Sequence, residues 1–246
     1  MKINIFTDND VIFKLARYAL LTDCVDLFTH HSYVFRYLNA LPYVAGIHTP
    51  SRANKMGFEP AHIQSILYFV SHSEPVTISD EQALDVIAQL RTPHLDAGDL
   101  ILTFGAQENK PSNLFTGDKR ALKAVNRMQH NGVLAMEGCH MLVLEEAIRL
   151  LMMCGDKDQV IASIQSRPHV DKAIDICFRD IASVDDALNS YIESIRSQCS
   201  LLSVIRVNPK HLLTWKFGLL FALDNVCYPA HQFLMRSTRT EGFPVC

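Results

Sequence analysis

The stretch Ile3-Asn4-Ile5-Phe6-Thr7-Asp8-Asn9-Asp10 decides the fold class, because it sets a short apolar strand directly before acidic residues. Apolar positions between 11 and 19 then recur at helical spacing. A strand, a short polar loop and a helix in this order make the βα unit of a parallel sheet. Lys2–Thr7 is therefore predicted as a buried strand, with Asp10 or Asn9 capping the helix that follows.

Beyond this unit, strand patterns continue to alternate with helical patterns, which is typical of an α/β fold with a parallel sheet. Further strands are predicted at 113–116 and 132–136, the latter as the last strand. Helices are predicted at 32–40, 60–72, about 79–92, from Asp96 onward, at 118–128 and at about 140–153, with a loop near 49–58.

The pattern changes near Gly155-Asp156-Lys157-Asp158, after which the sequence offers no further good strand. Periodic segments at 157–166, 169–182 and 184–198 predict helices. The predicted organisation is a main domain at 1–155 and an α-helical C-terminal extension at 156–246. Trp215 is expected to pack the extension on the main domain, and the tail after Arg236 is expected to be mobile.

Composition restricts the class of protein. The 246 residues are 48% hydrophobic, which is enough for a sizeable core, and the net charge is only −3. Any nucleic-acid binding must then come from a local basic patch. The seven cysteines form no CxxC pair, so reduced thiols in a cytoplasmic protein are expected. We expect no membrane partner, because no apolar run approaches the roughly 18–20 residues of a spanning helix and no secretory leader is visible.

Three acidic residues occupy related places in the predicted sheet. Asp8 and Asp118 each follow a predicted strand, and Asp99 lies near the start of a helix between them. Carboxylates at the carboxyl ends of parallel strands point into the crevice where such folds bind ligands. Gathered there they repel one another unless a cation neutralises them, and hard divalent metals take oxygen ligands. The pattern indicates a magnesium or manganese site, although an Asp after a strand is commonly a cap or turn residue.

Together these segments resemble the PIN domain family. The resemblance rests on the strand ending in Asp8, the internal Asp96-Ala97-Gly98-Asp99 motif, and Thr116-Gly117-Asp118 before a basic helix, and it covers roughly residues 1–150. It implies a metal-dependent ribonuclease on a Rossmann-like α/β sandwich with a central parallel sheet. Asp8, Asp99 and Asp118 would be the catalytic residues and the ligands of Mg²⁺ or Mn²⁺. Asp10 and Asp96 would serve either as auxiliary metal ligands or as helix caps.

One departure from the family concerns a further acid, often Glu, in the helix after the second strand. The corresponding stretch here, 31–38, contains Arg36 and no carboxylate. A cation near the metals would weaken metal binding or would hold a phosphate instead. Glu137, just after the predicted last strand, is either a further acid at the crevice or a turn residue.

A basic stripe supports an RNA substrate. Lys119, Lys123 and Arg127 are four residues apart on the helix after Asp118, and Lys14 on the first helix would extend the same surface. Phosphates of a substrate would pass this stripe beside the metal site. An ordinary solvated helix face explains the same pattern equally well.

Several functions remain open at this stage. The first hypothesis is a divalent-metal-dependent ribonuclease, a toxin or an RNA-processing enzyme, in which an activated water attacks the phosphorus in line. Its extension would then form a homo-oligomer or bind an antitoxin-like protein. The second is a catalytically inactive PIN-like scaffold that binds RNA or protein. A metal-dependent phosphatase or flap-type DNA nuclease is a third. Nucleotide-dependent chemistry is disfavoured, because the sequence has no glycine-rich phosphate loop.

Overall fold

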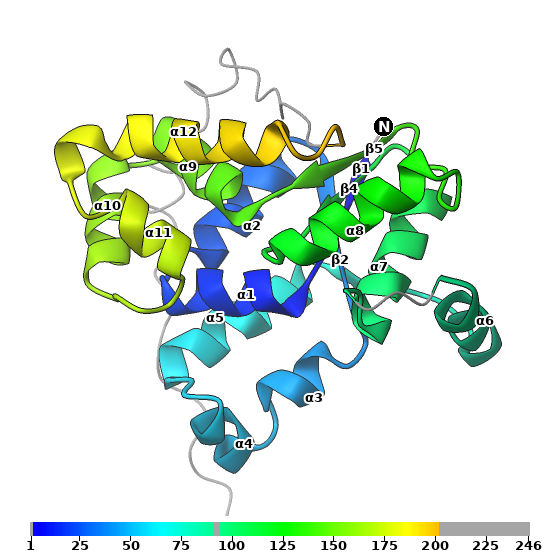
Figure 1. The fold of residues 1–246 in the computed structure, drawn as a ribbon. Coiled ribbons are helices and arrows are strands. Elements are labelled where there is room, and N and C mark those ends of the chain that lie inside the picture. Colours follow the sequence, from blue (N-terminus) through cyan, green and yellow to red (C-terminus); the bar gives the residue numbers. More distant parts are fainter. Residues whose placement is uncertain (1, 91–93, 202–246) are drawn as a thin grey trace, which may run out of the picture. The chain divides into compact units, whose positions relative to one another are not determined.

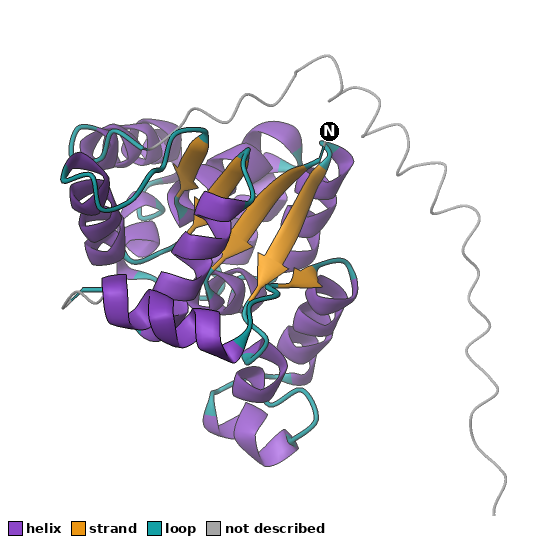
Figure 2. Cartoon of the chain, turned by 90° about the vertical axis from the view of Figure 1, so that its right-hand side faces the viewer, coloured by secondary structure: helices purple, strands orange, loops and turns teal. Residues whose placement is uncertain are grey.

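The computed structural model describes residues 2–90 and 94–201, which belong to one compact unit of the chain, Met1–Val207. These residues form a five-stranded parallel sheet with helices on both of its faces (Figure 1 and Figure 2). The strands are β1 Ile3–Thr7, β2 Tyr33–Tyr37, β3 Glu74–Pro75, β4 Ser112–Phe115 and β5 Cys139–Leu142. The helices are α1 Asn9–Arg17, α2 Leu21–His30, α3 Leu41–Ala45, α4 Pro50–Lys55, α5 Pro60–Ser71, α6 Asp80–Leu90, α7 Ala97–Glu108, α8 Lys119–His130, α9 Leu144–Cys154, α10 Lys157–Gln165, α11 Lys172–Cys177 and α12 Val184–Arg196, with a 3-10 turn at Ile181–Ser183.

The order of the strands puts a topological switch point between β1 and β4. Neighbouring strands follow the order β3-β2-β1-β4-β5, and all the pairings are parallel. The chain therefore adds β2 and β3 on one side of β1, and then adds β4 and β5 on its other side. Open α/β sheets bind ligands outside the carboxyl ends of the strands at such a switch point. The predicted α/β fold with a parallel sheet is confirmed.

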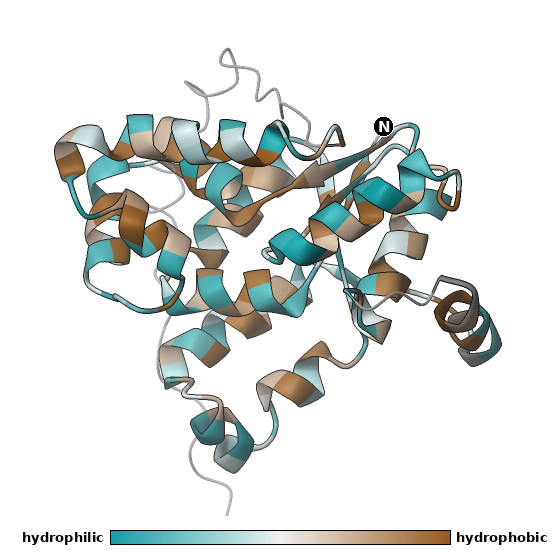
Figure 3. Cartoon of the chain, in the orientation of Figure 1, coloured by the Kyte–Doolittle hydropathy of each residue, from teal (hydrophilic) through white to brown (hydrophobic). Residues whose placement is uncertain are grey.

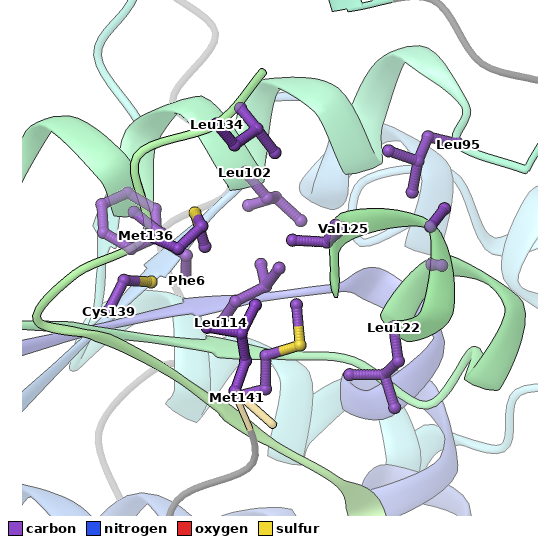
Figure 4. Close-up of a cluster of buried hydrophobic side chains, with 14 of the residues drawn as sticks. Phe6, Leu95, Leu102, Leu114, Leu122, Val125, Leu134, Met136, Cys139 and Met141 are labelled. Carbon is purple, nitrogen blue, oxygen red and sulfur yellow. The ribbon is translucent and has the colours of Figure 1, made fainter. Parts of the chain in front are cut away.

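Helix α7 packs closely on β1 beside the switch point. A β-carbon built at Gly105 would lie 2.6 Å from Cε1 of Phe6, so the absence of a side chain lets α7 approach the strand. On the same face, Phe6 and Leu114 meet Leu122 and Val125 of α8 in a buried cluster (Figure 4). Because α7 and α8 both pack on this core, the beginnings of both helices are held at the carboxyl end of the sheet.

The helices predicted beyond residue 155 are present as α10, α11 and α12, although the segment predicted at 169–182 is broken into α11 and the 3-10 turn. They pack on the α/β layer: the hydroxyl of Ser163 donates to the carbonyl of Tyr18 at 2.5 Å, and the Met141 amide donates to the carbonyl of Leu201 at 2.9 Å. The division of the chain at residue 155 stays a prediction. Trp215 and the tail after Arg236 lie outside the described residues.

Three predicted elements are wrong. The segment predicted as a helix at 32–40 contains β2, whose Tyr, Val and Phe residues suit a strand. The loop predicted near 49–58 contains α4, which begins at Pro50, a residue that fits the first turn of a helix. The apolar run at 132–136 lies between Gly132 and Gly138, both at positive φ, and the strand comes after it as β5. The helix predicted from His140 accordingly begins at Leu144.

Two further observations bear on the setting of the protein. In the part of the chain that the structure describes, no helix combines the length and the apolar composition that crossing a bilayer requires. The cysteines within these residues, Cys24, Cys139, Cys154, Cys177 and Cys199, are buried thiols.

Candidate acidic site at the strand ends

Asp8 stands at the end of β1, beside the switch point. Its backbone amide donates to the carbonyl of Phe115 at 2.9 Å, which ties the end of β1 to the end of β4. Asp8 is the N-cap residue of α1, yet its side chain makes no capping hydrogen bond. Burial, together with the negative charges of Asp99, Asp10 and Asp96, raises the pKa of Asp8 to about 6. The Asp8 carboxyl is therefore a partly buried acid among other acids.

Asp96 and Asp99 cap the beginning of α7 reciprocally. The Asp99 amide donates to Oδ1 of Asp96 at 2.8 Å, and the Asp96 amide donates to Oδ2 of Asp99 at 3.1 Å. Of the two roles predicted for Asp96, the cap is therefore present. Burial raises the pKa of Asp99 to about 6, and the charges of Asp96 and Asp118 contribute. The charge of Asp99 thus acts on Asp8, and the charge of Asp118 acts on Asp99.

The Thr-Gly-Asp motif makes a tight turn at the end of β4. The buried hydroxyl of Thr116 accepts a hydrogen bond from the Asp118 amide at 3.1 Å, and Oδ1 of Asp118 accepts one from the Arg120 amide at 2.7 Å. A β-carbon at Gly117 would lie 2.9 Å from Oδ2 of Asp10, so this turn passes close to the start of α1. The motif therefore brings Asp118 beside the start of α1.

Neither Asp10 nor Asn9 caps α1, so that expectation is wrong: the helix begins at Asn9, and Asp8 occupies the cap position. Asp10 lies in the first turn, where its Oδ2 is 2.6 Å from Nζ of Lys14. The same ammonium lies 2.8 Å from Oδ2 of Asp171, the residue that caps α11. Lys14 thus joins the acidic site to the helical segment, and its charge is shared between two carboxylates.

The side chains predicted for RNA binding divide into two kinds. Nζ of Lys119 lies 2.8 Å from Oε1 of Glu145, so Lys119 resembles Lys14 in being committed to an ion pair. Lys123 and Arg127 are exposed on the outer face of α8, whose buried face packs on the core. Figure 3 shows the beginning of α8 as strongly hydrophilic. The exposed cations of the predicted stripe are therefore Lys123 and Arg127.

The sequence failed to indicate two acids at the start of α9. Glu145 and Glu146 are buried and follow β5, and Nη2 of Arg196 lies 2.6 Å from Oε1 of Glu146. Glu137 precedes β5 and is exposed, so it is not an acid at the carboxyl end of the sheet. The misplaced last strand caused this error: a strand placed at 139–142 would have pointed to Glu145 and Glu146 instead.

Arg36 lies within β2 and not in a helix that follows it. Its Nε donates to Oδ1 of Asn4 at 2.9 Å, and its Nη1 lies 2.5 Å from Oε2 of Glu74 on β3. These partners hold the guanidinium at the strand pairing, away from the strand end that carries Asp8. The segment that does follow β2, residues 38–58, contains no Asp or Glu.

The carboxylate oxygens of the site suit a hard divalent cation, but some of them already accept hydrogen bonds from backbone amides. Within residues 2–90 and 94–201, no group of three or more His, Cys, Asp or Glu side chains is arranged to hold a metal ion. Asp96, Asp99 and Asp118 each give one oxygen to a backbone amide. A carboxylate has about four lone-pair sites, so these caps leave acceptor capacity on each of them.

Comparisons of the chain with family models, with curated proteins and with solved structures found no match. The PIN resemblance therefore stays a prediction, and the site is interpreted from its geometry.

Proposed function

We propose that the chain is a divalent-metal-dependent ribonuclease of PIN type. The observation that supports it best is that Asp8, Asp99 and Asp118 come from three different elements at the carboxyl end of the sheet, where burial and the charges of neighbouring acids raise the pKa of Asp8 and Asp99 to about 6. Partly buried carboxylates that repel one another destabilise a fold, and a bound cation offsets that repulsion.

In this proposal the chain's own residues hold and orient the substrate. Asp8, Asp99 and Asp118 would hold Mg²⁺ or Mn²⁺, which when bound supplies charge neutralisation at the phosphate and an activated nucleophile. Lys123 and Arg127, exposed on α8 beyond Asp118, would contact phosphates of the RNA backbone. The ion pairs of Lys14 and Lys119 give these two residues a positioning role around the acids.

The test is cleavage of a labelled structured RNA in Mn²⁺, Mg²⁺ or EDTA by the wild type, Asp8→Asn and Asp118→Asn. We expect metal-dependent cutting by the wild type and at least a 100-fold loss in each variant, the scale that removing one electrostatic contributor typically costs. Asp158→Asn is the matched control, because Asp158 is an exposed acid on α10. Cleavage that persists in EDTA, or in both site variants, would contradict the proposal.

A catalytically inactive scaffold is the second candidate, and two observations favour it. Three of the acids already serve as caps, and the segment after β2 has no carboxylate to supply the family's further acid. A scaffold predicts no cutting in any metal and no rise in melting temperature on adding Mn²⁺. A ribonuclease predicts cutting in the presence of a divalent metal and a rise in melting temperature on adding Mn²⁺.

A further inference from the structure

The connection after β2 carries an exposed aromatic ring with a cation on one face. Cζ of Arg52 lies 3.8 Å from the centroid of the Tyr43 ring. Tyr43 is nevertheless 68% exposed. Since the guanidinium lies over one side of the ring and the residue is still this exposed, the other side is the one left to solvent. A planar partner therefore has an open face on which to stack.

The charge around this ring favours an anionic partner. Residues 38–58 contain no acid, in a chain whose net charge is −3. The same segment carries Arg52 and Lys55, and His48 and Lys55 are exposed. An isolated exposed tyrosine needs no explanation, but a tyrosine backed by a guanidinium within a local excess of cations is a less ordinary arrangement. Nucleic-acid strands are bound by this combination of aromatic faces and positive charge.

The Tyr43 ring also lies on the side of the sheet where the strands end and where Asp8 is found. Tyr37, the last residue of β2, is the register partner of Thr7, which precedes Asp8. A β-carbon at Gly98, between the two capping acids of α7, would lie 2.9 Å from Cδ1 of Leu38. Tyr43 follows Leu38 by five residues of largely helical chain, on the order of 10 Å. Figure 1 and Figure 2 show α3 and α4 beyond the carboxyl ends of the strands, where α1 begins.

We propose that Tyr43 and Arg52 form a stacking site for an unpaired base of an RNA strand whose phosphates pass the acidic site. This inference deepens the proposed function, on which its placement of the phosphates rests. The base stacks on the open face of Tyr43. Arg52 holds the ring in position, and Lys55 and His48 lie where the adjoining phosphates run. In this proposal residues 38–58, which lack the family's further acid, bind the RNA strand instead.

The test measures RNA binding separately from cleavage. A fluorescein-labelled single-stranded oligoribonucleotide is titrated in EDTA by fluorescence anisotropy with the Asp8→Asn protein, alone and combined with Tyr43→Ala, Tyr43→Phe or Tyr43→Trp. Loss of one stacked base costs about 5- to 100-fold in affinity, so the alanine variant should bind that much more weakly. The phenylalanine and tryptophan variants keep a ring and should bind within about twofold of the parent, by the same reasoning.

Met153→Ala is the matched control, because Met153 is 63% exposed and lies on α9. It should bind as the parent does, and all variants should unfold at the same temperature. If Tyr43→Ala is unstable, Tyr43→Leu takes its place. As a second readout, the same titrations use an oligonucleotide whose bases are replaced one at a time by abasic residues. One abasic position should weaken binding to the parent and have no effect on Tyr43→Ala.

The two proposals fail in different ways. Equal affinity of the parent and Tyr43→Ala, or no RNA binding by the parent, overturns the stacking site. An equal loss in Met153→Ala does the same. Binding that depends on Tyr43 in a wild type that never cleaves supports the stacking site and overturns the ribonuclease.

Discussion

Nζ of Lys119 lies 2.8 Å from Oε1 of Glu145, a carboxylate with no exposed surface. A buried charge that loses its partner costs about 3–5 kcal/mol when both groups are fully buried. The Lys119 side chain is 25% exposed, so water recovers part of that cost. Lys119 is for this reason first a structural residue, whatever else it contacts.

Lys119→Met should accordingly lower the free energy of unfolding by about 2–3 kcal/mol, since it leaves Glu145 charged and unpaired. Lys123→Met, four residues along on the exposed face, should stay within about 0.5 kcal/mol of the wild type. Urea unfolding measures both. For RNA binding the larger effect is expected from Lys123→Met. Loss of this exposed cation should weaken RNA binding and reduce the slope of affinity against salt concentration by about one phosphate contact. Equal stability of the two variants would refute the structural role of Lys119.

The close approach of Gly105 to Phe6 gives a prediction in which two effects oppose each other. Alanine is preferred over glycine in a helix by about 1 kcal/mol, which alone would make Gly105→Ala stabilising. The added β-carbon would lie 2.6 Å from the Phe6 ring, and overpacking a core typically costs about 1–3 kcal/mol. We expect a net loss of stability in the wild-type background. With Phe6→Leu in place, the same change should become neutral or stabilising. A double-mutant cycle by urea unfolding measures this, and additive effects would contradict it.

The raised pKa values of Asp8 and Asp99 predict that the metal-free protein loses stability as the pH rises. Both lie at about 6 in the folded state, above the ordinary value of 3.8, so the folded protein binds these protons more tightly than the unfolded chain does. Their contribution to stability is complete below pH 3.8 and is lost as the pH rises through 6. Each pKa unit corresponds to about 1.4 kcal/mol, and partial exposure reduces the total to about 1–2 kcal/mol for Asp8.

Asp8→Asn, which cannot ionise, should thus exceed the wild type in unfolding free energy by about 1–2 kcal/mol at pH 7.5 in EDTA. The difference should shrink toward zero near pH 4. The exposed Asp158→Asn serves as the control and should show no such trend. If Asp8→Asn is instead less stable at pH 7.5, Asp8 takes part in a favourable interaction as a carboxylate, and the repulsion argument fails.

How far the sequence predicts this structure depends on how local each signal is. The β1–α1 unit and the Thr-Gly-Asp turn are local, since a short apolar strand meets acids and glycine within a few residues, and both were predicted close to their true bounds. β2 was predicted as a helix although its Tyr, Val and Phe residues favour a strand, and its pairing with the distant β1 settles it as one. The commitment of Lys14 to Asp171 was equally invisible, because 157 positions separate the two residues along the chain. The ion-pair partner of a surface cation depends on the tertiary structure. The spacing of basic residues along one helix face therefore does not predict it.

Asp118 offers the sharpest separation between a helix cap and a metal ligand, because one substitution keeps the cap and removes the charge. Its Oδ1 accepts a hydrogen bond from the Arg120 amide at 2.7 Å, and asparagine caps a helix about as well as aspartate. Asp118→Asn should therefore stay within about 0.5 kcal/mol of wild-type stability, whereas Asp118→Ala should lose about 1 kcal/mol. Asp156 caps α10 by accepting from the Gln159 amide, so Asp156→Ala is the matched control for loss of a cap. The deciding measurement is the rise in melting temperature on adding Mn²⁺, which should vanish in both Asp118 variants and persist in Asp156→Ala. A full Mn²⁺ response in Asp118→Asn would leave Asp118 as a cap alone.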